Sequence, residues 1–244
     1  MAGTRRLRVG LGASLREFLR QPVNLALLVA LPPVVVVSYG AVLSAFPDLP
    51  WLGTDPGTLG ALNGALFVAA FLPGVVGLFQ VISATADERL ALCGFPRAAL
   101  FGSRLLTVGA ASLLTAGLSL AVLTTRTTVA DPPVAYLALV TAGLVYGGVG
   151  MLVGALLPRE LEGSLVLVFL ADVDEALASG IVRADTVLAD LLPLHYPHAL
   201  FQPAVEGTGV AAGDALGAAG YLAALLAVAL GAYVVVTGEG GVLP

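Results

Sequence analysis

The chain has 244 residues, of which 58% are hydrophobic and 11% are charged, whereas soluble domains carry about 25% charged residues. All eleven cationic residues are arginine, so no lysine is present for a G-x-x-x-x-G-K-[ST] phosphate-binding loop. The single cysteine, Cys93, excludes an intrachain disulfide and a C-x-x-C motif. These features indicate a membrane protein that leaves any ATP binding to another chain.

The first predicted element is an amphipathic helix over residues 4–21. Its apolar side chains follow helical spacing and are flanked by arginines. They are Leu7, Leu11, Leu15, Phe18 and Leu19. We expect this helix to lie in the membrane interface, with an ordinary cytosolic cap as the alternative.

Five strongly apolar windows follow, each long enough to cross a hydrocarbon core that requires about 20 residues. They are Val23–Phe46, Leu59–Ala84, Leu105–Thr124, Val134–Leu157 and Ala215–Thr237. None contains Asp, Glu, Lys, Arg or His.

A sixth, weaker window runs from Leu161 to Ala171 and then meets Asp172, Asp174 and Glu175. We expect it to cross, and its shortness suggests that it abuts a polar opening or protein rather than lipid all round. The three acids lack the EF-hand spacing and are expected at a solvated helix end. The predicted fold is an all-α membrane bundle of six transmembrane helices, one domain over residues 1–244, with an outer segment over 172–214.

Arginines are distributed unevenly between the predicted loops, and basic residues close to the spans stay in the cytoplasm. With the N-terminus inside, nine arginines fall on the cytoplasmic side and two, Arg126 and Arg183, fall outside. We therefore expect a multi-pass protein of the cell membrane with both termini in the cytoplasm.

The segment ADERLALCGFPRAALFGSRLL (86–106) combines charges and apolar side chains between the second and third windows. Pro96 cannot continue a helix begun at Asp87, but it can open the next helix, whose first turn does not use its missing N–H. We therefore predict a short helix, a turn at Pro96 and a second helix that starts at Arg97. Such a cytoplasmic surface over 86–104 suits a soluble partner, and a solvated loop is the alternative.

Two further patterns lie inside the windows. Small residues at close helical spacing allow helices to approach, and we expect packing within one subunit more than between subunits; the residues are Gly143, Gly147, Gly150 and Gly154. An aromatic, weakly polar wall on the second window suits a hydrophobic or amphipathic substrate, with plain core packing as the alternative. Its residues are Asn63, Phe67, Phe71, Phe79 and Gln80.

His195 and His198 near Asp190 suggest a metal site at first sight. However, only one carboxylate is close in sequence, and Tyr196-Pro197 favours a turn that keeps the two imidazoles from acting together. We therefore expect no metal site here.

Four segments, in this order, resemble the membrane subunit of an ABC-2-type transporter, a permease class of ABC exporters. They are LREFLRQPVNLALLVALPPVVVV (15–37), DERLALCGFPRAALFGSRLL (87–106), GMLVGALLPRELEGS (150–164) and LLPLHYPHALFQPAVEG (191–207). The short window 161–171 departs from the strong fifth span of that family.

The resemblance implies two permease subunits, identical or different, on two ATPase subunits that bind ATP and Mg and drive export. This chain would then be no enzyme, would hold no cofactor of its own and would contact lipid but no nucleic acid. Its coupling segment would contact the ATPase through Asp87, Glu88, Arg89, Leu92, Phe95, Pro96 and Arg97.

The main alternative is a secondary transporter or channel that ATP does not drive. Ion-coupled carriers usually need an ionisable residue at mid-membrane, and the five strong windows have none. An integral membrane enzyme is the third choice, because the inner loops offer only Asp87, Glu88, Glu160 and Glu162 as acids and no histidine.

Overall fold

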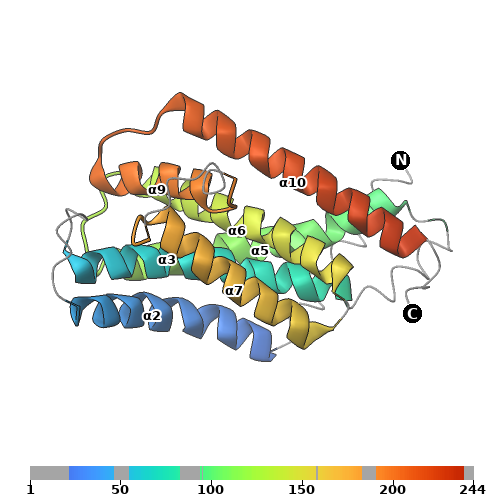
Figure 1. Cartoon of the computed structure of the whole chain (residues 1–244), viewed down its shortest axis with the longest axis horizontal. Helices are drawn as coiled ribbons and strands as arrows, with labels where there is room; N and C mark the ends of the chain where they lie inside the picture. The colour runs from blue at the N-terminus through green and yellow to red at the C-terminus, as the bar shows by residue number, and fades with distance from the viewer. Residues whose placement is uncertain are drawn as a thin grey trace.

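The computed structural model describes residues 22–46, 55–82, 94, 96–157, 159–182 and 191–238, and this part of the chain is a helical bundle without strands (Figure 1). The predicted interfacial helix over 4–21 lies outside the described residues. The helices are α2 (Pro22–Ser44), α3 (Pro56–Ile82), α5 (Arg97–Leu123), α6 (Pro132–Leu156), α7 (Glu160–Ala178), α9 (His195–Glu206) and α10 (Ala212–Gly238).

Five of these helices are long and apolar enough to cross a membrane, and they coincide with the five strong windows. They are α2, α3, α5, α6 and α10. Their length and composition fit the predicted transmembrane, multi-pass character of the chain. The third of them begins earlier than its window, at Arg97, directly after Pro96, as predicted from the proline.

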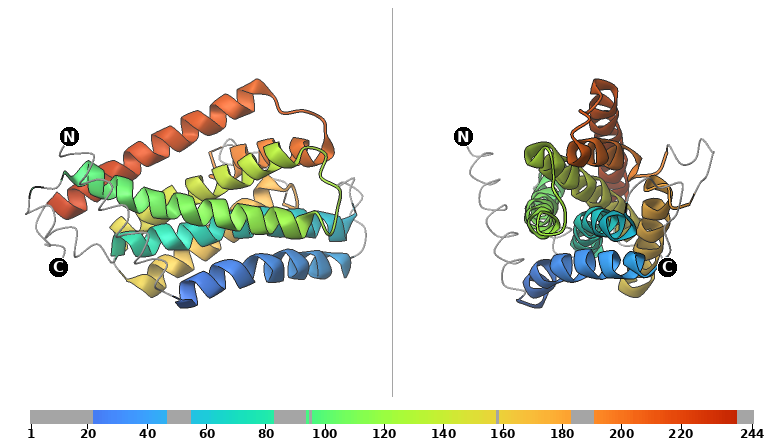
Figure 2. Two further views of the ribbon diagram at one scale, coloured as in Figure 1. Left: turned by 180° about the vertical axis from the view of Figure 1, so that it is seen from behind. Right: turned by 90° about the vertical axis from the view of Figure 1, so that its left-hand side faces the viewer.

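Helices α3 and α6 form the centre of the bundle, and the other helices surround them (Figure 2). Helix α3 contacts α2, α5, α6 and α7, while α6 also contacts α9 and α10. Helices α2 and α10 lie at the periphery, where large apolar side chains such as Val34 and Val228 are exposed. An apolar exterior of this kind suits lipid rather than water.

Proline and aspartate determine where two of these helices begin. Asp55 accepts hydrogen bonds from the backbone N–H of Thr58 at 2.9 Å and from its hydroxyl at 3.2 Å, directly before α3. Asp131 accepts from the N–H of Val134 at 3.2 Å, and two prolines occupy the first positions of α6. Each aspartate accepts a hydrogen bond from an N–H that has no partner within the first helical turn. A proline in this turn has no N–H, so it leaves no donor unpaired.

Helix α7 differs from the other long helices because its two faces have different chemistry. Leu161, Leu165 and Phe169 are exposed at intervals of four residues, whereas Asp174 and Glu175 are 0% and 3% exposed. The helix continues beyond the apolar window to Ala178, so the acids lie within it and not in solvent. The prediction of a solvated helix end is therefore wrong for Asp174 and Glu175, although Asp172 is exposed.

The close approach of α3 and α6 depends on glycine. A Cβ atom on Gly150 would collide with the carbonyl oxygen of Gly74, and one on Gly154 would lie 2.8 Å from the carbonyl oxygen of Leu78. Similarly, a Cβ on Gly143 would lie 2.9 Å from the carbonyl oxygen of Ala69. The structure thus places these glycines against neighbouring helices of the same chain, where any side chain would push the backbones apart.

We predict that Gly150→Ala destabilises the protein, because the added methyl group overlaps the backbone of α3. Overpacking of this kind costs about 1–3 kcal/mol, which the thermal unfolding midpoint in detergent will report as a decrease. Gly220→Ala is the matched control, since a Cβ at that exposed position in α10 meets nothing within 4 Å. The control should be neutral or slightly stabilising, because alanine favours helix over glycine; equal losses in both variants would contradict the packing role.

Candidate functional site

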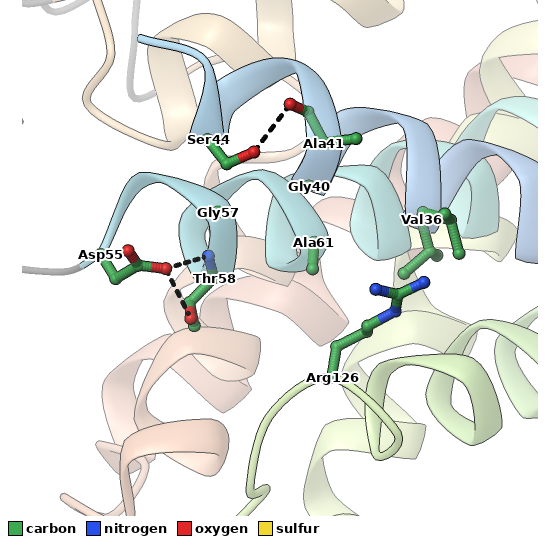
Figure 3. A pocket seen from close by; sticks show the side chains of 10 residues that line it. Val36, Gly40, Ala41, Ser44, Asp55, Gly57, Thr58, Ala61 and Arg126 are labelled. Atoms are coloured by element: carbon green, nitrogen blue, oxygen red, sulfur yellow. Dashed lines mark hydrogen bonds between the residues drawn. The ribbon is translucent and has the colours of Figure 1, made fainter. Parts of the chain in front are cut away.

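A cavity of about 380 Å³ opens between α2 and α3 at the end of the bundle where the loop after α5 lies (Figure 3). Small and apolar residues line its walls, among them Val36, Gly40 and Ala61. Its two charged residues, Asp55 and Arg126, differ in whether they are free to bind a ligand. Asp55 is engaged as the cap of α3, whereas the guanidinium of Arg126 points into the cavity beside Val36 (Figure 3).

The arrangement of this cavity suits a molecule with two kinds of surface. Small and apolar residues of α2 and α3 form an apolar wall, and Arg126 supplies one cation at the edge. Arg126 is exposed and forms no ion pair with the residues that the structure describes. An amphipathic ligand with an acidic group could therefore place its chain against the helices and its charge on the guanidinium.

The predicted aromatic, weakly polar wall of α3 is divided among three places, and none of them is the cavity of Figure 3. Phe67 stacks between Tyr39 and Phe71, with ring centroids 5.5 Å apart in both pairs. Gln80, two turns further along α3 with Phe79 beside it, accepts a hydrogen bond of 2.9 Å from Arg104. Phe67 and Phe71 thus pack in the hydrophobic core, as the alternative interpretation of this wall expected.

Asn63 lies at a smaller cavity of about 50 Å³ between α3, α7 and α9. Its side chain is 3% exposed, and its amide nitrogen has no hydrogen-bond partner among the described residues. The other polar residues of the lining are Ser179, His198, Gln202 and Glu206. Of the five predicted substrate-path residues, Asn63 lines this smaller cavity, and none lines the cavity of Figure 3.

The two histidines do not lie in a turn. Helix α9 begins at His195, so Tyr196-Pro197 falls in its first turn, where proline is tolerated. The predicted turn is therefore wrong. Burial lowers the pKa of His198 to about 4, His195 acts in the same direction, and Glu206 opposes them. No group of three or more His, Cys, Asp or Glu able to hold a metal occurs among the described residues.

A pair of acidic side chains is buried where α7 meets the centre of the bundle. Asp174 accepts a hydrogen bond of 2.6 Å from the hydroxyl of Tyr146 and one of 2.9 Å from the N–H of Leu194. Neither carboxyl oxygen of Glu175 has a partner among the described residues. On the exposed side of α7, Asp172 accepts a bond of 3.3 Å from Tyr39 of α2.

The sequence contained a signal for this pair that hydropathy alone misses. Gly163, Leu167 and Ala171 recur every four residues, and Asp174 is the next residue on the same helical face. All four are buried. Arg104 was missed for a related reason, because it precedes its apolar window, yet it is only 7% exposed within α5.

The predicted coupling segment is described only at its end. Asp87, Glu88, Arg89, Leu92 and Phe95 lie outside the described residues. Pro96 adopts an extended backbone, with φ −69° and ψ 130°, and Arg97 is the first residue of α5 and is half-buried. Helix α5 therefore begins directly after an extended Pro96.

No protein-family model matches this sequence, and no match is found among the curated proteins compared with it. The likeness to ABC-2-type permeases therefore remains a prediction from the order of its segments.

We predict that His198 makes stability depend on pH on the acidic side. The folded protein keeps His198 neutral down to about pH 4, whereas the unfolded chain binds a proton near pH 6.5. The unfolded state therefore gains protons first, and folding stability falls as the pH drops through this interval. In His198→Gln this loss should be shallower than in the wild type, measured as the unfolding midpoint against pH. The two proteins should not differ in this pH dependence near neutral pH. An equal fall of the unfolding midpoint with decreasing pH in both proteins would contradict the assignment to His198.

Proposed function

We propose that this protein is the membrane permease subunit of an ATP-driven ABC exporter and that a separate subunit hydrolyses ATP. The observation that carries the proposal is the start of α5 at Arg97, directly after the extended Pro96. Helix α3 ends and α5 begins at the same end of the bundle (Figure 1), and in the sequence the charged residues Asp87, Glu88 and Arg89 stand between these two helices. A rigid helix that enters the bundle there can transmit a push from a soluble motor. The absence of lysine, and with it of a phosphate-binding loop, supports a motor on another chain.

The direction of α7 supports a sixth crossing of the membrane by this helix. Helices α6 and α10 run in one direction along the bundle, and α7, which stands between them in the sequence, runs in the opposite direction (Figures 1 and 2). Its exposed apolar stripe would face lipid, and its acids would face protein, as intramembrane acids usually do. A crossing α7 places the start of α2 and the end of α10 at the same end of the bundle.

The distribution of described arginines supports a cytoplasmic position for that end. Helix α5 begins at Arg97, with Arg104 two turns further along it, and α7 begins directly after Arg159; both helices start at that end of the bundle, whereas Arg126 lies in the loop after α5 at the opposite end (Figure 1). Basic residues close to the spans stay inside. Both termini would then be cytoplasmic, and the cavity at Arg126 would open toward the outer face. We assign the substrate to the hydrophobic or amphipathic class, because this cavity combines apolar walls with one guanidinium.

The partner and the coupling can be tested together. We predict that the tagged chain, purified from its host, carries a second protein with a G-x-x-x-x-G-K-[ST] loop. Charge reversal by Glu88→Arg together with Arg97→Glu should lower transport per ATP hydrolysed by about tenfold or more, equal to about 1.4 kcal/mol of coupling. Arg159→Glu, at the same end of the bundle but paired with Glu162 at 2.8 Å, is the control. Purification without any ATPase, or undiminished coupling in the double variant, would contradict the proposal.

The outer cavity provides a separate test of the substrate class. Arg126→Gln should weaken binding of an anionic amphiphile, such as a fluorescent fatty acid, because it removes a charged hydrogen bond worth about 1.5–3 kcal/mol. A cationic amphiphile of the same chain length should bind the wild type and the variant alike. Binding that does not depend on the headgroup charge would contradict a role for Arg126. Fluorescence titration of the purified protein in nanodiscs measures both.

A second candidate function is an ion-coupled carrier, and the buried pair Asp174 and Glu175 favours it. Carriers place ionisable groups inside the membrane to bind the coupling ion. Proteoliposomes that contain this chain alone distinguish the two functions. Uphill transport driven by an ion gradient, without any ATPase, would support the carrier over the permease.

A further inference from the structure

We infer that Glu175 is a proton-binding site and that the bundle adopts the packing seen here with this carboxyl group neutral. The inference starts from the contrast between two adjacent acids on α7. Asp174 and Glu175 are 0% and 3% exposed. Asp174 receives two hydrogen bonds, from Tyr146 and Leu194, whereas both oxygens of Glu175 lack a partner among the described residues.

Among the residues that the structure describes, no cation acts on Glu175. Asp174 is the charged group that acts on it, and like charge opposes its ionisation. Helix α3, against which α7 packs, has no titratable residue. The titratable residues that face or adjoin this region from the other helices are Tyr39 of α2, Tyr146 of α6, His195, His198 and Glu206 of α9, and Tyr221 of α10.

The free energy of an unpaired charge decides which acid carries the proton. Burying an ionised carboxylate without partners costs several kcal/mol, even after the protein relaxes. Two donors reduce this cost for Asp174, and nothing on the described residues reduces it for Glu175. A single proton shared by this pair therefore resides on Glu175, and Asp174 keeps the hydrogen bonds that tie α7 to α6 and to the start of α9.

A proton fits this position better than a metal ion. Hard cations such as Ca²⁺ take six to eight oxygen ligands, and the described residues form no group of three acidic, histidine or cysteine side chains. Polar groups follow one turn beyond Glu175. Ser179, the C-cap of α7, lines the small cavity together with His198 and Glu206.

Proton binding at Glu175 is thermodynamically linked to the conformation of the bundle. The proton binds tightly while α7 is packed against α3, and any movement that admits water to the end of α7 favours its release. Each transport cycle that opens this region would then release and rebind one proton. That role rests on the proposed transport function, whereas the protonation of Glu175 does not.

The protonation state can be measured directly on the purified full-length chain in nanodiscs. Infrared spectroscopy at neutral pH should show the carbonyl stretch of a protonated carboxylic acid, and Glu175→Gln should remove it. Glu162→Gln, the same substitution at an exposed position on the same helix, should leave it in place. Persistence of the band in Glu175→Gln, or its loss in Asp174→Asn instead, would overturn the assignment.

Thermal stability gives an independent readout that does not require an ATPase or a substrate. A neutral Glu175 in the folded state and an ionised one in the unfolded state make the wild type less stable as the pH rises. Glutamine mimics the neutral acid, so Glu175→Gln should unfold at a higher temperature than the wild type, by a margin that widens above neutral pH. A margin that is absent, reversed or independent of pH would overturn the inference. Loss of transport with both readouts as expected would instead count against the proposed function alone.

Discussion

The contact between the backbones of α3 and α6 is the constraint on which the rest of the structure depends. Gly150 lies against the backbone of Gly74, where it could carry no side chain, so the two central helices approach more closely than a larger residue at that position would allow. In a membrane no hydrophobic effect drives helices together, and close van der Waals contact must replace it. The remaining helices pack around this pair, and the peripheral α2 and α10 add apolar surface toward lipid.

This central pair also determines where polar groups can be buried. Tyr146 lies one turn before Gly150 on α6, fully buried, and its hydroxyl holds Asp174 of α7. The hydrogen bond from Leu194 then connects the same carboxylate to the start of α9. The side chain of Asp174 thus connects α7 to α6 and to the start of α9. The adjacent Glu175 is buried without a hydrogen-bond partner among the described residues.

The buried acids change the balance between the two candidate functions. The five apolar windows contain no Asp, Glu, Lys, Arg or His, which favours a permease driven by another subunit. The structure adds Asp174, Glu175 and Arg104 to the interior, each from outside those windows. A permease with an exchangeable proton in its interior is compatible both with the uncharged windows and with the buried acids. ATP can supply the energy, while the proton is bound and released as the conformation changes.

The sequence by itself determined the helical class, the five apolar crossings and the start of α5 after Pro96, because these depend on composition, length and local backbone chemistry. Only the tertiary structure decided the environment of side chains at the ends of those windows. Hydropathy averages over a window and assigns Asp174 and Glu175 to solvent, yet helical geometry turns them inward with Gly163 and Leu167. The cavity at Arg126 likewise joins residues from α2, α3 and the loop after α5, and no local pattern encodes that proximity. Burial and partnership are properties of neighbours in space, so they emerge only when the helices are packed.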